Sequence, residues 1–135
     1  MPKKKFTTCI IIDDDPINIF LHKVIIRRLQ NEIEIVAFSD ASKGLEYIKG
    51  NYSEDTLNNT LILLDLNMPV MNGKQFIKEI MKLDETIKKQ LEILIVSSSI
   101  DEFDMESCHL YRSCFSVSKI IQKPLTLKMV KEIIF

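Results

Sequence analysis

The sequence predicts an α/β fold, a doubly wound five-stranded parallel sheet with helices on both faces. Short apolar runs alternate with longer stretches of helical period, and the alternation repeats five times. Strands that helices cover on both faces read as continuous apolar runs, which is the pattern seen here. The chain has 135 residues and is 46% hydrophobic, so we expect one core and a single domain over residues 1–135.

Five apolar runs are predicted to form the strands. They span residues 8–12, 33–38, 61–64, 93–96 and 119–121, the last being the most polar. No run approaches the roughly 20 residues of a membrane span. The N-terminus also lacks the apolar core of a signal peptide, so a cytoplasmic location is expected.

Five helices are predicted between and after these strands. The first begins at Pro16 with Asp15 as its N-cap. Its apolar residues lie on one stripe, formed by Ile17, Phe20, Leu21, Val24 and Ile25. Asp40 is expected to cap the second helix, and the third follows Asn72 and Gly73. The fourth is predicted over residues 101–115 and the fifth from about Leu125 to the C-terminus.

Polar residues stand where the predicted strands end. Asp13 and Asp14 follow the first strand, Asp65 the third, Ser97 the fourth and Lys123 the fifth. Ligands of open doubly wound sheets bind outside these carboxyl ends. In the flavodoxin-like strand order 2-1-3-4-5 the first and third strands are neighbours, so the three carboxylates converge. Like charges held together imply a hard divalent cation, and oxygen ligands suit Mg²⁺.

The motifs around these residues resemble those of response regulator receiver domains in two-component signalling, of the chemotaxis-regulator type. The matching stretches are Ile-Ile-Asp-Asp-Asp-Pro at 11–16, Leu-Leu-Asp-Leu-Asn-Met-Pro-Val-Met-Asn-Gly at 63–73, Val-Ser-Ser at 96–98 and Lys-Pro at 123–124. The resemblance covers essentially the whole chain. It implies that Asp65 accepts a phosphoryl group from a phosphohistidine on a sensor histidine kinase or a histidine phosphotransfer protein.

The resemblance also implies roles for the neighbouring residues. Asp14 would bind Mg²⁺ directly, Asp13 through a metal-bound water, and Asp65 and the backbone carbonyl of Asn67 would complete the ligands. Ser97 and Lys123 would hold the phosphoryl group. The domain would catalyse its own phosphorylation and dephosphorylation as a signalling phosphoacceptor, and not as an enzyme acting on another substrate.

The resemblance further implies that phosphorylation switches the face formed by the fourth helix, fifth strand and fifth helix, for an unidentified effector or a homodimer. Ile120 stands where many relatives have an aromatic switch residue, so a serine-plus-aromatic relay is not expected. Asp15 is interpreted as a helix cap, and Pro69 and Gly73 as residues that shape the loop after Asp65, Gly73 through its backbone freedom.

The remaining candidates are interpreted as structural. Cys9, Cys108 and Cys114 lack the close pairs of a zinc or redox motif, so reduced thiols are expected. His22 and His109 are also interpreted as structural residues. The 18 basic and 19 acidic residues nearly cancel, which disfavours direct binding to nucleic acid or a membrane.

Three alternatives share parts of this pattern. A magnesium phosphatase of the haloacid dehalogenase type has a second acid two residues after its nucleophile, where this chain has Asn67. A flavodoxin has a phosphate-binding loop rich in Ser, Thr and Gly after the first strand, where this chain has acids. A pseudo-receiver signals without phosphorylation, and this alternative is disfavoured by the intact Asp14, Asp65, Ser97 and Lys123.

Overall fold

The computed structural model describes residues 6–53, 59–66, 68, 70–97, 113, 114 and 116–133. The strands are β1 (Thr8–Ile12), β2 (Glu34–Phe38), β3 (Thr60–Asp65), β4 (Leu91–Ser97) and β5 (Val117–Gln122). The helices are α1 (Pro16–Leu29), α2 (Ala41–Asn51), α3 (Gly73–Met81), α4 (Glu85–Lys88) and α6 (Leu127–Ile133). Strands and helices alternate along most of the chain, as the sequence predicts.

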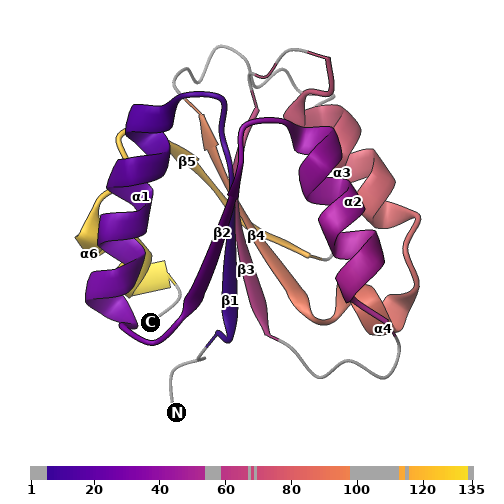
Figure 1. Ribbon diagram of the computed structural model, residues 1–135, viewed down its shortest axis with the longest axis horizontal. Coiled ribbons are helices and arrows are strands. Elements are labelled where there is room, and N and C mark those ends of the chain that lie inside the picture. The colour runs from indigo at the N-terminus through magenta and orange to yellow at the C-terminus, as the bar shows by residue number, and fades with distance from the viewer. Residues whose placement is uncertain are drawn as a thin grey trace.

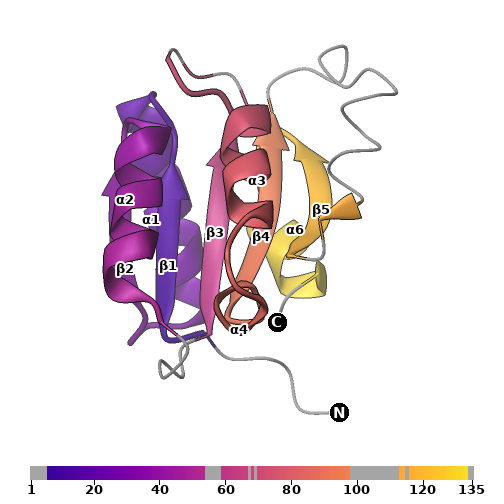
Figure 2. The same cartoon turned by 90° about the vertical axis from the view of Figure 1, so that its right-hand side faces the viewer.

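The sheet has five parallel strands in the order β2-β1-β3-β4-β5. Helices α1 and α6 cover one face, and α2 and α3 cover the other (Figure 1). Turned by 90°, the sheet shows its strands side by side with their arrowheads toward one edge (Figure 2). The predicted fold class and strand order are therefore confirmed. Among the described residues, no helix combines the length and apolar character needed to cross a membrane.

Two apolar layers hold the helices to the sheet because successive strand residues point to opposite faces. On β1, Ile10 and Ile12 pack with the residues of α2 and α3, whereas Cys9 and Ile11 pack with those of α1 and α6. All four are fully buried. Burial raises the pKa of the Cys9 thiol strongly, so this thiol stays protonated and behaves as a small apolar side chain.

Helix α1 begins where predicted, but the predicted packing stripe is wrong. The face turned to the protein interior carries His22 and Ile26, which are buried. Ile17 and Phe20 are 68% and 65% exposed, and Leu21 and Val24 are 50% and 43% exposed. Only Ile25 of the predicted stripe packs against the core. The helix is apolar on two opposite faces, so helical period alone could not show which one meets the sheet.

The remaining elements agree with the sequence in part. The first strand has the predicted bounds, β2 begins one residue later than predicted, and the other three strands extend beyond their predicted runs. The short helix α4 was not predicted. The predicted helix over residues 101–115 lies outside the described residues except for Ser113 and Cys114. Asp40 caps α2 as predicted, because its carboxylate accepts the backbone N–H of Ser42 at 2.8 Å.

Candidate functional site

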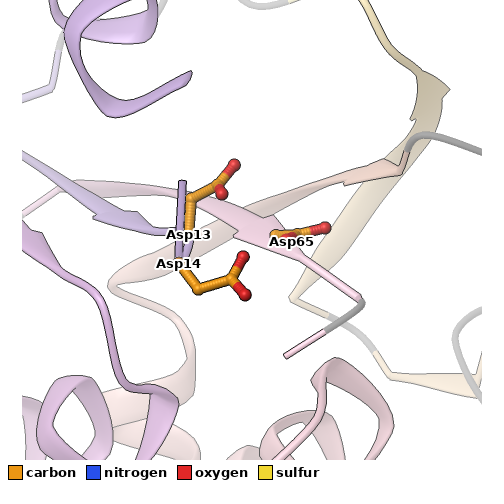
Figure 3. A group of neighbouring side chains, drawn as sticks. All are labelled: Asp13, Asp14 and Asp65. Atoms are coloured by element: carbon orange, nitrogen blue, oxygen red, sulfur yellow. The ribbon is translucent and has the colours of Figure 1, made fainter. Parts of the chain in front are cut away.

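Three carboxylates meet at the carboxyl edge of the sheet. Asp13 and Asp14 directly follow β1, and Asp65 is the last residue of β3. The parallel pairing of β1 with β3 sets Ile12 opposite Leu64, which brings the two chain segments side by side. One carboxylate oxygen from each aspartate lies within 4.8 Å of the others. The side chains emerge next to one another at the strand ends (Figure 3). The predicted convergence is present.

Asp13 and Asp14 sit in different surroundings although they are neighbours in sequence. Asp13 is 2% exposed, and both of its oxygens are engaged. Its Oδ1 accepts the backbone N–H of Asp15 at 2.9 Å, and its Oδ2 accepts from the Lys123 ammonium at 3.1 Å. Asp14 is exposed. A cation can therefore reach the Asp14 carboxylate directly, whereas direct binding to Asp13 would compete with bonds already made.

Lys123 brings the compensating positive charge. Its Nζ lies 3.1 Å from Asp13 Oδ2 and 3.5 Å from Asp65 Oδ1. Strand pairing fixes this position, because Ser97 pairs with Gln122 and the backbone N–H of Lys123 donates to the Ser97 carbonyl at 2.6 Å. Because the Lys123–Asp13 ion pair is buried, its net contribution to stability is small. The ion pair nevertheless holds the Lys123 ammonium beside the acid cluster.

Ser97 ends the strand next to β3 and is fully buried. In the pairing of β3 with β4, Asp65 lies opposite Val96, so Ser97 is one residue further toward the carboxyl edge. The structure thus brings Asp13, Asp14, Asp65, Ser97 and Lys123 to one edge of the sheet. Asn67, the remaining predicted ligand, lies outside the described residues.

Asp15 belongs to the helix and not to the acid cluster, as predicted. Its Oδ1 accepts the backbone N–H of Ile17 at 2.9 Å, which caps α1. Within the described ranges, Asp13, Asp14 and Asp65 form the one group of three or more side chains that could hold a cation.

In the loop between β3 and α3, steric space and not backbone conformation explains why residue 73 is glycine. Gly73 does not have a positive φ, so the predicted conformational reason is wrong. A Cβ at this position would lie 2.8 Å from the Leu66 Cα, closer than real contacts allow. Asn72 and Gln75 form a capping box that starts α3 directly after the loop. Pro69 lies outside the described residues.

Val70 is a strained residue of this loop. Its φ is 70°, a region that β-branched residues rarely adopt, and its side chain is 91% exposed. Backbone strain of this kind persists only where the surrounding structure enforces it, and it is common beside functional sites. The amino-acid sequence does not reveal this position, because residue types do not show backbone torsions.

His22 is a second residue whose environment the sequence did not reveal. It is 5% exposed, and its Nδ1 is buried without a hydrogen-bond partner among the described residues. Burial lowers the pKa of His22, while the charge of Asp13 raises it and that of Lys123 lowers it. The imidazole is therefore close enough to the acid cluster to sense its charge. The interpretation of His22 as a packed histidine agrees with its burial.

The donor set fits a hard divalent cation. Three carboxylates with one ammonium carry an excess of negative charge, and the close approach of like charges costs energy unless a cation is added. All available ligand atoms are oxygens, which suit Mg²⁺ or Ca²⁺ and not soft metals. Receiver domains generally bind Mg²⁺ at such an acidic pocket.

Comparisons with known proteins agree with this site. The family model of the response regulator receiver domain matches residues 9–135. No curated protein matches the chain at a significant level. A two-component response regulator from Cytophaga hutchinsonii has a similar structure, with TM-score 0.79 and 25% identity over 96% of this chain and 95% of that one.

Two further solved structures share the fold. A receiver protein from Dyadobacter fermentans superposes with TM-score 0.75 at 22% identity, over 93% of this chain and 92% of that one. The phosphorylated cyanobacterial phytochrome response regulator RcpA superposes with TM-score 0.71 at 24% identity, over 96% and 89%. Because the family model spans nearly the whole chain, and the acid cluster lies where the motifs predict, the protein belongs to the family of response regulator receiver domains.

Proposed function

We propose that Asp65 accepts a phosphoryl group from a phosphohistidine on a sensor histidine kinase or a histidine phosphotransfer protein. The observation that carries this proposal is the position of the Asp65 carboxylate, 3.5 Å from the Lys123 ammonium and beside Asp13 and Asp14. Family membership supports a phosphoacceptor role in two-component signalling. The structural relative RcpA is described in its phosphorylated form.

In the proposed step, an Asp65 carboxylate oxygen attacks the phosphorus of the phosphohistidine. A P–O bond forms while the P–N bond breaks, and the electron pair of that bond leaves with the donor imidazole. Lys123 lies close enough to Asp65 to neutralise charge on the transferring group. Mg²⁺, held by Asp14 and Asp65 directly and by Asp13 through water, with the Asn67 carbonyl as a further ligand, would supply the remaining positive charge.

Neighbouring polar groups would then bind the acyl phosphate on Asp65. The Ser97 hydroxyl and the Lys123 ammonium stand at the same sheet edge and can hydrogen-bond the added oxygens. Hydrolysis by water would return Asp65 to its carboxylate, so the domain would catalyse both its own phosphorylation and its own dephosphorylation. We also propose that the protein is cytoplasmic and that its phosphorylated form acts on a downstream effector or forms a homodimer.

The readout would pass through β5, where Ile120 is partly buried against the core layer of α2 and α3. An aliphatic side chain fills this place without the in-and-out rotation expected of an aromatic one. We therefore propose that the Ser97 hydroxyl carries the response to phosphorylation, and that the Ile120 side chain stays packed. Residues 98–112, which would follow Ser97 in this response, lie outside the described residues.

Intact-mass spectrometry after incubation with acetyl phosphate tests the proposal. Wild type should gain one phosphate only when Mg²⁺ is present, and Asp65→Asn should gain none. Asp84→Asn is the matched control, because Asp84 is an exposed aspartate that directly precedes α4 and lies outside the acid cluster. A wild type that stays unmodified, although a separate titration shows Mg²⁺ bound, would contradict the phosphoacceptor role.

A further inference from the structure

A groove with a volume of about 350 Å³ runs along α3 on the side of α2. The two helices lie side by side on one face of the sheet (Figure 1). Ser42 at the start of α2 lines one wall, and four α3 residues line the other, namely Gln75, Lys78, Glu79 and Lys82. Their spacing places them on one side of α3 over about 10 Å, so the groove is elongated.

The loop before α3 adds two apolar side chains at one end of this α2–α3 groove. Val70 is 91% exposed, and Met71 is partly buried against the core layer of α2 and α3. A single exposed valine is ordinary. Here, however, a backbone with φ of 70° holds the valine side chain beside a groove, and the strain costs free energy. Contact with an apolar group of another molecule would offset part of this cost.

Positive charge dominates the rest of the groove. Glu79 is already paired, because its carboxylate lies 3.0 Å from the Lys82 Nζ and 4.0 Å from the Lys49 Nζ. Lys78 is exposed and forms no ion pair within the described part of the chain. The lining thus carries two lysines against one carboxylate, with Lys49 as a further cation nearby. An anionic group is therefore attracted to the groove, and the Lys78 ammonium is available to bind it.

We propose that the α2–α3 groove binds a short acidic segment of a partner protein, with an apolar side chain against Val70 and carboxylates near Lys78 and Lys82. An extended segment rises about 3.3 Å per residue, so about three residues span the groove. Most of the lining residues are exposed, which suits a peptide segment better than a small molecule, because small-molecule sites bury most of their ligand.

So short a contact gives weak and reversible binding, with a dissociation constant on the order of 100 μM. The lining residues lie on α2, on α3 and in the loop before α3. This surface is therefore separate from β5 and α6, which belong to the face proposed for readout. Its occupant is recognised by charge and apolar contact, and phosphorylation of Asp65 is not required.

A peptide array, followed by fluorescence anisotropy with unphosphorylated protein, tests this proposal. The array carries peptides of about eight residues, longer than the groove, in which one Leu, Met, Phe or Val stands at varied distances from two Asp or Glu residues. Control sets have Lys in place of the acids or Ser in place of the apolar residue. Wild type should prefer the acidic, apolar set. Its dissociation constant should rise about fivefold between about 50 mM and about 500 mM salt, because salt screens the charges.

Substitutions on the protein locate the bound peptide. Val70→Asn removes the apolar contact and should raise the dissociation constant about fivefold, whereas Val70→Ile should change it less than about twofold. Because Val70→Asn relieves backbone strain, weaker binding by this variant cannot result from unfolding. Lys78→Glu should raise the constant about 10-fold. Lys23→Glu is its matched control, since Lys23 is exposed on α1 across the sheet and should change the constant less than about twofold.

Other outcomes would overturn the proposal. Equal binding of the acidic peptides and their Lys-substituted counterparts, or no binding of either at about 1 mM protein, excludes an acidic partner. Equal weakening by Lys23→Glu and Lys78→Glu places the peptides elsewhere on the protein. If no peptide binds but wild type sediments with phosphatidylserine vesicles and Lys78→Glu does not, the groove recognises an anionic lipid surface instead. All these measurements use unphosphorylated protein, so their failure is distinct from a failure of the acetyl phosphate test.

Discussion

The two ends of the sheet differ in how their polar groups are paired. At the amino end, the hydroxyl of Tyr52 bonds the buried hydroxyl of Thr60. The Gln90 amide donates to the Ser53 and Thr86 carbonyls at 3.0 and 2.9 Å. At the carboxyl end, three carboxylates share one ammonium.

This difference indicates that the polar groups at the amino end stabilise the fold, whereas those at the carboxyl end destabilise it and serve the proposed chemistry. The polar groups of the amino end are matched donor to acceptor, which favours the folded state. The carboxyl end keeps like charges together and a strained Val70 nearby, and both are costs that a bound cation or phosphoryl group can offset. Substitutions should therefore destabilise the amino end and can stabilise the carboxyl end.

The largest effect is expected from Tyr52→Phe. Removal of the phenolic hydroxyl leaves the buried Thr60 hydroxyl without this partner, and the free energy of unfolding should fall by about 2 kcal/mol. Urea unfolding monitored by circular dichroism measures the change. Tyr47→Phe is the control, because Tyr47 lies on α2 against Phe38 and its hydroxyl is not part of this pair. Equal losses from both variants would contradict the role of the hydrogen bond.

At the other end, Val70→Asn should stabilise the protein. Asn tolerates a φ of 70° far better than a β-branched residue, and the side chain is exposed, so the free energy of unfolding should rise by about 1 kcal/mol. Val70→Ile keeps the β-branch and should give no gain. The same urea titration decides between them, and an equal response of the two variants would argue against strain at this position.

Asp14→Asn should also stabilise the protein when Mg²⁺ is left out. The change removes one of three like charges within 4.8 Å, and the expected gain is about 0.5–1 kcal/mol. The thermal midpoint should then respond less to added Mg²⁺ than that of wild type. Asp84→Asn, outside the cluster, should leave both quantities unchanged. A destabilised Asp14→Asn would mean that repulsion among the carboxylates is already relieved in the folded protein.

The smallest effect is a pH dependence from His22. Burial lowers the pKa of His22 below its ordinary 6.5, so the unfolded chain binds more protons between the two pKa values. The stability from the neutral imidazole is fully present above pH 6.5 and is lost as the pH falls through that value. Relative to His22→Leu, wild type should lose about 0.5 kcal/mol between pH 7.5 and 5.5. A constant difference across this range would show that His22 does not titrate on unfolding.

Much of the candidate site was predictable from sequence because parallel strands end at one edge of the sheet. Asp13, Asp65 and Lys123 each follow or end an apolar run, so their meeting depends only on the order of strands. The division between Asp13 and Asp14 needed coordinates. Two adjacent aspartates look alike in sequence, and only packing decided that one is buried and bonded to Lys123 while the other faces solvent.

The sequence by itself determined the alternation of elements, the caps of α1 and α2 and the acids at the strand ends. These features depend on local periodicity, on short-range hydrogen bonds and on the connectivity of a parallel sheet. Only the tertiary structure decided which apolar face of α1 is buried, why position 73 is glycine, and which aspartate Lys123 holds. Each of these depends on atoms brought together from distant parts of the chain, and residue types alone do not encode such distances.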